Sequence, residues 1–412
     1  MLKNYFKIAI AVLKRRKFFT FISLFGISFT LTILMVATAF TDKMFSPDYP
    51  DYKRARSLYI TRVQLENSKD GWINVSSASY HLLSKYISKL KTPEKVAIFT
   101  FSSPANTYIN NKKLVIEYKY TNADYWDVAE YQFLEGKPYS KQQIEQAAHV
   151  AVITAATRKN YFGDVATAVG KYIEADNVSY RVVGVVKDLP RTLRNFYADL
   201  YLPYTVSKSD YKEVGLLGGY GAVLLARSEA EMPKMKAEYE QMIAKVPHGD
   251  KEFDLMYVNA DTSLEAFSRN IFGNGANSGI WLMITIMSLV ILLFLLLPTI
   301  NLININITRI MERSSEIGVR KAFGASSRTL VYQFVVENII LTLLGGLIGV
   351  VLSIIVIYAF NQSNLVPNLS LSLNLTVLSF GLVICLLFGL LSGVYPAWRM
   401  SRLNVVTALK SQ

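Results

Sequence analysis

Four segments of the chain contain no charged residue, and they lie at 18–40, 279–308, 338–360 and 375–398. About 20 apolar residues in a helix cross the hydrocarbon core of a bilayer. Each segment is long enough for one crossing, so the pattern predicts four membrane-spanning helices. A cleaved signal peptide is the alternative for 18–40, but its apolar part is about 7–15 residues long, which favours a retained helix.

Residues 41–278 have a different pattern, in which polar and apolar residues alternate between turn-forming residues. Alternation predicts strands, and apolar residues three or four apart predict helices. A capped helix over 76–90 places Tyr80, Leu83 and Ile87 on one face, and a second helix is expected over 229–246. The predicted strands are 58–65, 95–101, 112–120, 150–154 and 180–186. This mixture predicts an α+β domain inserted between the first two membrane helices.

The chain leaves this domain through residues 261–278. A helix capped by Asp261 or Ser263 is expected first, followed by the turn Gly273-Asn274-Gly275. Glycine and asparagine in sequence favour a turn, so they predict an interruption before the helix 279–308. Pro298 predicts a kink in that helix.

Basic residues flank the apolar segments. Residues 1–17 contain six Lys and Arg without an acidic residue, 309–337 contain five against three, and 399–412 contain three against none. Removing these 14 basic and 3 acidic residues from the totals of 44 and 31 leaves 30 and 28. The net charge of +13 therefore follows the positive-inside rule rather than a nucleic-acid surface. It predicts cytoplasmic 1–17, 309–337 and 399–412, and external 41–278 and 361–374.

The charged loop at 309–324 is predicted to be helical. Glu316 and Arg320 lie four residues apart, a spacing that supports an ion pair on one helix face. Gly324 is a suitable stop residue, and Ser326 is a suitable cap for the next helix. The loop either only sets the topology or docks on a partner.

The sequence from Glu316 to Ala325, with Gln333-Phe334, Glu337 and Gly345-Gly346, resembles the signature of FtsX/MacB-type ABC transporter permeases. The resemblance implies a coupling helix that docks on a separate cytoplasmic ATPase. The residues that would form it are Glu316, Ile317, Gly318, Arg320, Lys321, Ala322, Phe323 and Gly324.

The outer segment carries further similarity, in an order typical of MacB-type periplasmic core domains. It comprises Tyr125-Trp126-Asp127-Val128 and the segments 133–138, 150–153, 161–163, 170–171 and 182–188. These are turn formers and apolar strands, so we expect each to be scaffold. In this family, extensions of the first two membrane helices form a stalk, which the Gly273-Asn274-Gly275 turn calls into question.

Two pairs of glycines have the four-residue spacing that permits close contact between membrane helices. They are Gly345 with Gly349 and Gly389 with Gly393. The ending resembles the family's terminal pattern, except that Val405 stands where the family usually has proline.

Several kinds of chemistry have no motif in this chain. There is no GxxxxGK[ST] loop for ATP, and no GxSxG turn. His81, His149 and His248 lack zinc-binding spacing, and the single Cys385 cannot form an internal disulfide. The predicted spans carry no charged residue, which argues against an ion-coupled carrier. We therefore expect no enzymatic activity, no metal and no cofactor, with ATP bound by the partner.

The sequence thus predicts a multi-pass permease subunit of an ABC complex in the bacterial inner membrane. The resemblance implies that a separate ATPase drives it, that two permease chains assemble, and that its motion reaches the outer domain by mechanotransmission. A periplasmic adaptor and an outer-membrane channel are further partners that it suggests. The alternative is an FtsX-like regulator of a cell-wall hydrolase, whose outer domain tends to be smaller than 41–278. A membrane-anchored enzyme would need a catalytic constellation that the sequence does not offer.

Overall fold

A computed structural model describes residues 10–11, 13–15, 17–109, 112–208, 211–247, 252–311, 319, 323, 326–373, 376, 379–380, 383 and 387. The chain forms two compact units. The first contains Met1–Met44, Ile284–Leu365 and Ser370–Gln412, and the second contains Phe45–Met283 and Val366–Leu369. We call the second unit the outer domain.

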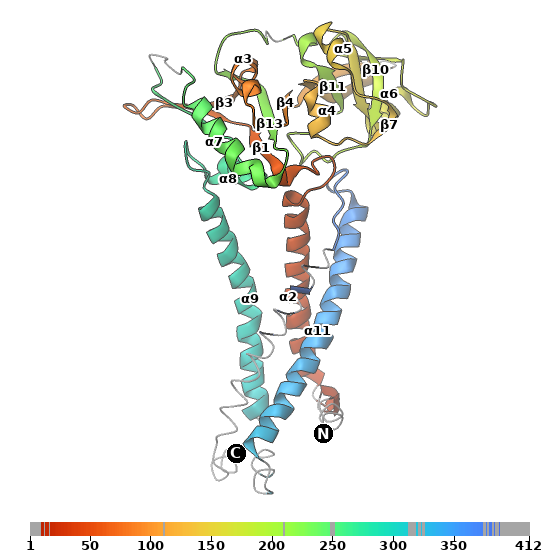
Figure 1. The fold of residues 1–412 in the computed structure, drawn as a ribbon. Coiled ribbons are helices and arrows are strands. Elements are labelled where there is room, and N and C mark those ends of the chain that lie inside the picture. Colours follow the sequence, from red (N-terminus) through yellow and green to blue (C-terminus); the bar gives the residue numbers. More distant parts are fainter. Residues whose placement is uncertain are drawn as a thin grey trace. The chain divides into compact units, whose positions relative to one another are not determined.

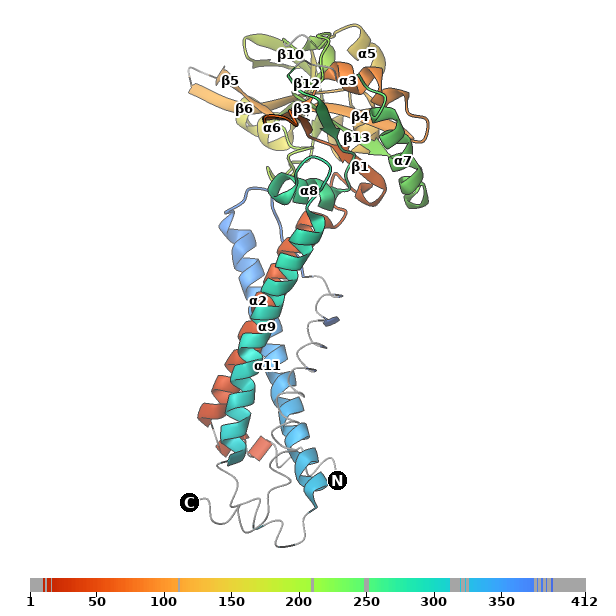
Figure 2. The same cartoon turned by 90° about the vertical axis from the view of Figure 1, so that its left-hand side faces the viewer.

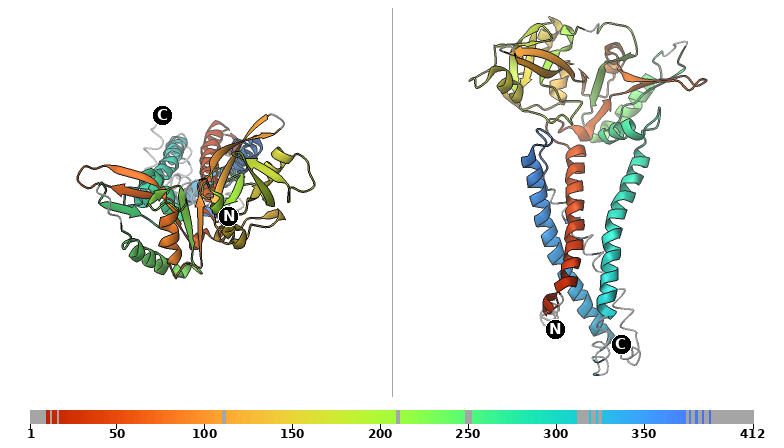
Figure 3. Two further views of the ribbon diagram at one scale, coloured as in Figure 1. Left: turned by 90° about the horizontal axis from the view of Figure 1, so that it is seen from above. Right: turned by 180° about the vertical axis from the view of Figure 1, so that it is seen from behind.

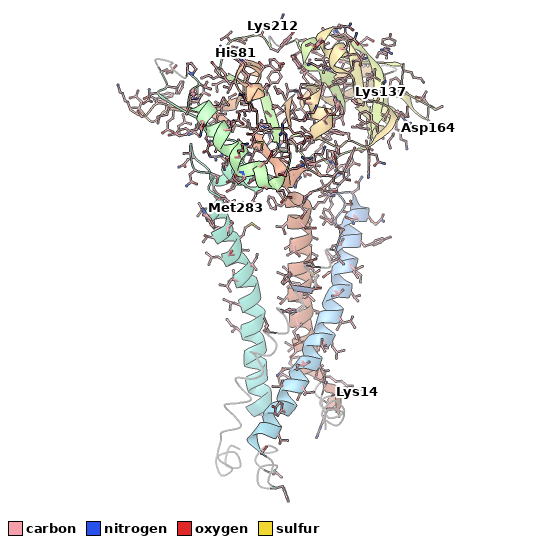
Figure 4. All side chains as sticks on the ribbon, in the orientation of Figure 1. Lys14, His81, Lys137, Asp164, Lys212 and Met283 are labelled. Atoms are coloured by element: carbon pink, nitrogen blue, oxygen red, sulfur yellow. The ribbon has the colours of Figure 1, made fainter. Side chains whose placement is uncertain are left out.

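Three long helices dominate the first unit: α2 (Lys17–Phe45), α9 (Ile280–Met311) and α11 (Ser327–Ser363) (Figure 1). Figure 4 labels Lys14 just before α2 and Met283 near the start of α9. Each helix is longer than the apolar segment from which it was predicted, because helical hydrogen bonding continues into the flanking polar residues. Helix α9 continues through Pro298.

Within the described residues, two helices are long and apolar enough to cross a membrane, Lys17–Phe45 and Val335–Ser363. A shorter apolar helix, Ile280–Leu293, belongs to α9. The predicted span 375–398 lies largely outside the described residues. The number of four spans therefore stays a prediction.

The outer domain combines a large mixed sheet with short helices, which confirms the predicted α+β class. Its helices are α3 (Tyr80–Lys85), α4 (Asp124–Val128), α5 (Lys141–Glu145), α6 (Ala155–Phe162), α7 (Met232–Ile243) and α8 (Ser263–Phe272). Its 3-10 turns are η1 (Arg54–Arg56), η2 (Ile87–Lys89), η3 (Tyr204–Val206) and η4 (Glu229–Glu231). Its strands are β1 (Ser57–Ile60), β2 (Val63–Glu66), β3 (Ile73–Ala78), β4 (Lys95–Thr100), β5 (Ser103–Ile109), β6 (Lys112–Thr121), β7 (Phe133–Gly136), β8 (Val150–Thr154), β9 (Tyr172–Ala175), β10 (Val178–Val186), β11 (Leu200–Pro203), β12 (Leu217–Gly218), β13 (Tyr220–Leu225) and β14 (Leu255–Val258).

The strand order is β14-β2-β3-β13-β4-β6-β11-β8-β10-β7, with β1 on β13, β12 on β3, β5 on β6 and β9 on β10. Strands β8 and β10 are parallel, as are β6 and β11, and the other pairs are antiparallel. In the described part of the sheet, a single pair, Phe99 with Thr121, joins β4 to β6. Figure 2 shows the β5–β6 hairpin extending from the sheet, and Figure 3 shows the sheet from above.

Alternate residues of the strands pack on opposite faces of the sheet, as the pleat of a strand requires. In β13, Val223 and Leu225 pack in an aromatic-rich core with Tyr125, whereas Ala222 and Leu224 pack in a different core. In β8, Val150 and Val152 join the same aromatic-rich core, while Ala151 and Ile153 join a third one. One core therefore extends along one face of the sheet, and two smaller cores cover the other face.

The segments that carry the family similarity are scaffold, as expected. Tyr125 and Trp126 are buried in the aromatic-rich core. Gly136 has a φ of +63°, and a β-carbon there would lie 2.1 Å from the carbonyl oxygen of Val183. This close approach of β7 to β10 requires glycine.

Three predicted elements need correction. The predicted strand 58–65 is two strands, because β1 pairs with β13 while β2 pairs with β3 and β14. The predicted helix 76–90 begins only after its cap Ser79, because Ser76 still belongs to β3. The helix after 261 is capped by Thr262, whose hydroxyl accepts a hydrogen bond from the backbone N–H of Glu265. Asp261 and Ser263 were the wrong residues.

The predicted interruption of the stalk is confirmed. Helix α8 ends at Phe272 and α9 begins at Ile280. Gly279 has a φ of +70°, and a β-carbon there would lie 2.7 Å from the side chain of Phe272. The chain between the two helices is therefore a tight turn.

Candidate functional site

The predicted coupling segment is only partly described. Glu316, Ile317, Gly318, Arg320, Lys321, Ala322 and Gly324 lie outside the described residues. The backbone N–H of Phe323 donates to the carbonyl oxygen of Val319 at 3.1 Å, the spacing of one helical turn. The Phe323 side chain is 88% exposed, which makes it a large apolar group available to a partner.

The start of α11 is as predicted. The hydroxyl of Ser326 accepts a hydrogen bond from the backbone N–H of Thr329 at 3.2 Å. This cap satisfies a backbone donor that the helix leaves free. Ser326 therefore separates the charged loop from α11.

Helices α2 and α11 pack along a stripe in which buried residues recur at every fourth position. On α2 these are Ser23, Ile27, Leu31, Met35 and Ala39, and on α11 they are Leu341, Gly345, Gly349, Ser353 and Ile357. Rows of residues four apart form the ridges of a close helix crossing. Figures 1 and 3 show the two helices crossing.

Two glycines bring these helices close together. A β-carbon at Gly345 would lie 2.8 Å from Ile27, and one at Gly349 would lie 2.9 Å from the carbonyl oxygen of Ser28. Small residues at such a crossing let two backbones approach, which is how membrane helices gain packing energy. Gly389 and Gly393 lie outside the described residues.

Glu337 is buried inside α11, with 2% of its surface exposed. The sequence placed it at the end of the charged loop, yet the apolar segment Val335–Ser363 includes it. The predicted span 338–360 itself carries no charged residue, and Glu337 lies directly before it within the same helix. Among the described residues of this part of α11, burial begins at Glu337, one residue before the uncharged run that starts at Asn338.

The outer domain contains two largely buried polar clusters, one where the chain enters the domain and one where it leaves. The N-terminal cluster is Ser46, Asp51, Arg54 and Tyr59, at the point where the chain enters the domain. Arg54 Nε donates to Asp51 at 2.8 Å, and an Arg54 terminal nitrogen donates to the carbonyl oxygen of Ser46 at 3.1 Å. The phenol of Tyr59 donates to the Asp51 carboxylate, whose oxygens lie at 2.7 and 2.9 Å.

The C-terminal cluster is Gln64, Asp261, Arg269 and Gly275, where the chain leaves the domain. Arg269 donates to both carboxylate oxygens of Asp261, at 2.5 and 2.9 Å, and to the carbonyl oxygen of Gly275 at 2.8 Å. The N–H of Gly275 donates to the side-chain oxygen of Gln64 at 3.2 Å. Such a two-bond pair has a fixed geometry, so it holds the turn after α8 in place.

Tyr59 belongs to both clusters. Its backbone N–H donates to the carbonyl oxygen of Asp261 at 2.7 Å, and the N–H of Asp261 donates back to the carbonyl oxygen of Tyr59 at 3.0 Å. The ring of Phe45 at the end of α2 packs edge-on against Phe267 of α8, with centroids 5.4 Å apart. The two crossings of the domain boundary are thus joined by polar and by aromatic contacts.

Burial controls the electrostatics of these clusters. It raises the pKa of Asp51, although Arg54 acts in the opposite direction. Burial, and then the Asp51 carboxylate, raise the pKa of Tyr59 well above its usual range. Arg62 lies beside the C-terminal cluster and donates to the side-chain oxygen of Gln64, and burial and the nearby Arg269 lower its pKa. Tyr59 therefore remains a phenol that donates to Asp51.

Neither cluster follows from the sequence. Asp51 and Arg54 are three residues apart in an irregular segment, and Asp261 and Arg269 are eight apart across a helix cap. Within the described residues, no group of three or more His, Cys, Asp or Glu could hold a metal ion.

Comparison with known proteins defines the class. The chain matches the family described as MacB-like periplasmic core domain over residues 20–242, and the family described as FtsX-like permease C-terminal over residues 288–405. The first match covers more than half of the chain. The protein therefore belongs to the FtsX/MacB-like ABC transporter permeases, and it is a membrane permease with an extracytoplasmic α+β domain.

Individual relatives are longer than this chain. It is 27% identical over 287 residues to the pyoverdine export ATP-binding/permease protein PvdT of Pseudomonas syringae pv. tomato, covering 70% of this chain and 41% of that protein. It is 25% identical over 369 residues to the macrolide export ATP-binding/permease protein MacB of Salmonella typhimurium, covering 89% and 51%. The chain thus spans about half the length of these relatives or less.

Two solved domains are similar to this chain. One is the periplasmic region of MacB from Actinobacillus actinomycetemcomitans, with 18% identity, a TM-score of 0.36, and coverage of 53% of this chain and 94% of that one. The other is the extracellular domain of the transporter YknZ from Gram-positive bacteria, with 14% identity, a TM-score of 0.36, and coverage of 48% and 98%.

Proposed function

We propose that this chain is the permease subunit of an ABC transporter complex that transmits ATP-driven motion to its outer domain. It crosses the bacterial inner membrane four times, and the outer domain acts on a substrate that is exported or extracted on the outer side. The observation that carries this proposal is the pair of buried polar clusters that hold both ends of the outer domain. A domain that must follow its membrane helices needs such fixed connections.

In this proposal the ATPase is a separate subunit, and the printed sequence itself offers no phosphate-binding loop of the GxxxxGK[ST] type. It docks on residues 316–324, where the exposed Phe323 supplies apolar contact area. The names of the relatives describe proteins that combine ATP-binding and permease parts. A permease with its ATPase on another chain is the corresponding two-subunit arrangement.

The complex contains two permease chains, because one chain of four spans offers each ATPase a single coupling segment. A periplasmic adaptor and an outer-membrane channel would complete an export pathway. The relatives are named for export of pyoverdine and of macrolides. The outer surface of this chain determines its own substrate.

The test measures two quantities at equal membrane levels of permease: how much of the cognate ATPase co-purifies with the permease, and how much the permease stimulates ATP hydrolysis by that ATPase. Phe323→Ser, Gly324→Val and Glu316→Lys should weaken both, since each removes or distorts the docking segment. Tyr332→Ser is the matched control, because Tyr332 is an aromatic residue that is 65% exposed outside the motif. If all three variants retain the ATPase and full activity, the segment only sets the topology, and this function is wrong.

A further inference from the structure

The outer domain is not attached to α9 by a continuous helix. Between α8 and α9 the chain makes a turn, in which Gly275 has a φ of +41° and Gly279 a φ of +70°. A displacement of α9 therefore reaches the domain through the contacts of this turn. One set of these contacts is made at the C-terminal cluster, where Arg269 and Asn259 both donate to the carbonyl oxygen of Gly275.

The connection to α2 has the same character. Helix α2 ends at Phe45, and the next residue, Ser46, is held by Arg54. Arg54 is bound to Asp51, and Asp51 to Tyr59. All of these side chains except that of Ser46 are buried, and a buried ion pair resists opening because separation leaves an unpaired charge.

We propose that Tyr59 joins the N-terminal and C-terminal clusters into one rigid junction, through which displacements of α2 and α9 reach the outer domain together. Its phenol binds the first cluster and its backbone binds the second. Tyr59 also lies in β1, which pairs with β13 in the middle of the sheet, opposite Val223. The junction thus leads into the largest core of the domain.

This inference rests on the proposed function, so its test separates the two. The full chain is reconstituted with its ATPase in lipid nanodiscs, and hydrogen–deuterium exchange is measured without nucleotide and with ATP and vanadate. The reporter is the segment of β8 and α6, residues 150–162, which belongs to the other end of the sheet. The wild type should show a nucleotide-dependent change in exchange there.

Two variants interrupt the junction. Tyr59→Phe removes the phenol hydroxyl and keeps the ring, and Arg269→Gln removes the pair with Asp261. Tyr59→Phe loses one hydrogen bond to a charged group and should reduce the nucleotide-dependent change about tenfold. Arg269→Gln loses two bonds to Asp261 and should reduce the change at least as much. ATPase co-purification should stay at the wild-type level in both variants.

The matched control is Tyr197→Phe. Tyr197 is also a buried phenol that donates to a carboxylate, Asp199 at 3.0 Å, and it accepts from an arginine, Arg191 at 3.1 Å. It lies outside both clusters, so its loss should leave the nucleotide-dependent change intact. Equal losses in Tyr197→Phe and Tyr59→Phe would mean general loosening of the domain, which overturns the junction.

The remaining outcomes are also decisive. No nucleotide-dependent change in the wild type would refute mechanotransmission, and with it this inference. A wild-type response in Tyr59→Phe would refute the junction while leaving the proposed function intact. If Arg269→Gln fails to fold, the result for Tyr59→Phe alone tests the junction. If Tyr59→Phe misfolds as well, the phenol stabilises the fold rather than coupling the helices to the domain, and the junction is refuted.

Discussion

The hydroxyl oxygen of Thr32 in α2 lies 3.2 Å from the carbonyl oxygen of Gly349 in α11. It also lies 2.7 Å from the carbonyl oxygen of Ser28 in its own helix, so the hydroxyl hydrogen is shared between one carbonyl oxygen of each helix. A contact to the backbone of the neighbouring helix requires a residue without a side chain at that crossing. Gly349 meets this requirement.

Replacing Gly349 with leucine should destabilise the pair of α2 and α11. The new side chain would meet the backbone of Ser28 and the side chain of Leu31, and overpacking of this kind costs about 1–3 kcal/mol. Gly26→Leu is the matched control, because a β-carbon at Gly26 has no atom within 4 Å. Thermal unfolding in detergent should separate the two variants, and equal midpoints would contradict close packing at Gly349.

The charge pattern predicts that Ser326 faces the cytoplasm and that Asp164 faces outward. With Cys385 replaced by serine, Asp164→Cys in intact cells should react with a membrane-impermeant thiol reagent. Asp164 is exposed in the outer domain, where Figure 4 labels it. Ser326→Cys should react only after the cells are opened. Labelling of Ser326→Cys in intact cells would contradict the predicted topology.

Residues 46–278 should fold when expressed without the membrane helices, because they contain all three cores of the outer domain. Chemical denaturation followed by circular dichroism should show one cooperative transition. A shorter fragment, 46–270, lacks the Gly275 carbonyl that Arg269 binds, which should lower the free energy of unfolding by about 1–3 kcal/mol. An aggregated longer fragment would contradict independent folding, and equal stabilities would contradict the role of Gly275.

Lys119 should make the stability of the outer domain depend on pH. It is fully buried, donates to the carbonyl oxygen of Asn195 at 2.7 Å, and lies over the ring of Phe99. Burial lowers its pKa well below the ordinary 10.5, so the unfolded chain binds more protons than the folded chain. Stability contributed by this residue therefore rises as the pH increases toward 10.5.

The measurement compares urea unfolding of wild type and Lys119→Met at pH 7 and pH 10. The wild type should gain stability relative to the variant at the higher pH. Lys95→Met is the control, because Asp127 and Asp124 raise the pKa of Lys95, and its contribution is lost only above the ordinary value. If the difference in free energy of unfolding between wild type and Lys119→Met is the same at both pH values, the Lys119 amine is not desolvated in the folded state.

Where the sequence predicted the fold correctly, local chemistry was enough. The strand 150–154 has the predicted limits, because a short apolar run between polar residues leaves little choice. The interruption near Gly273-Asn274-Gly275 was also readable, since turn residues act locally. By contrast, alternation over 58–65 continues while the pairing partner changes from β13 to β3, and no local signal reports a change of partner.

The polar clusters show the same distinction. Thr262 and Asp261 are neighbours, and both residue types can cap a helix. Thr262 caps α8 because the carboxylate of Asp261 is bound by Arg269 instead. Burial of Glu337 likewise depends on packing within the first unit rather than on its neighbours in sequence. Residues of the coupling segment were recognised by resemblance, whereas Tyr59 has no distinguishing sequence context.

The paired backbone hydrogen bonds between Tyr59 and Asp261 place the start and the end of the outer domain side by side. A domain whose two ends are adjacent can be inserted into another protein, or replaced by a different domain, without changing the distance that the host chain must span. The outer domain should therefore be exchangeable as a single unit. Under the proposed function, transplanting 46–278 into another permease of this family should carry the substrate range of this chain with it.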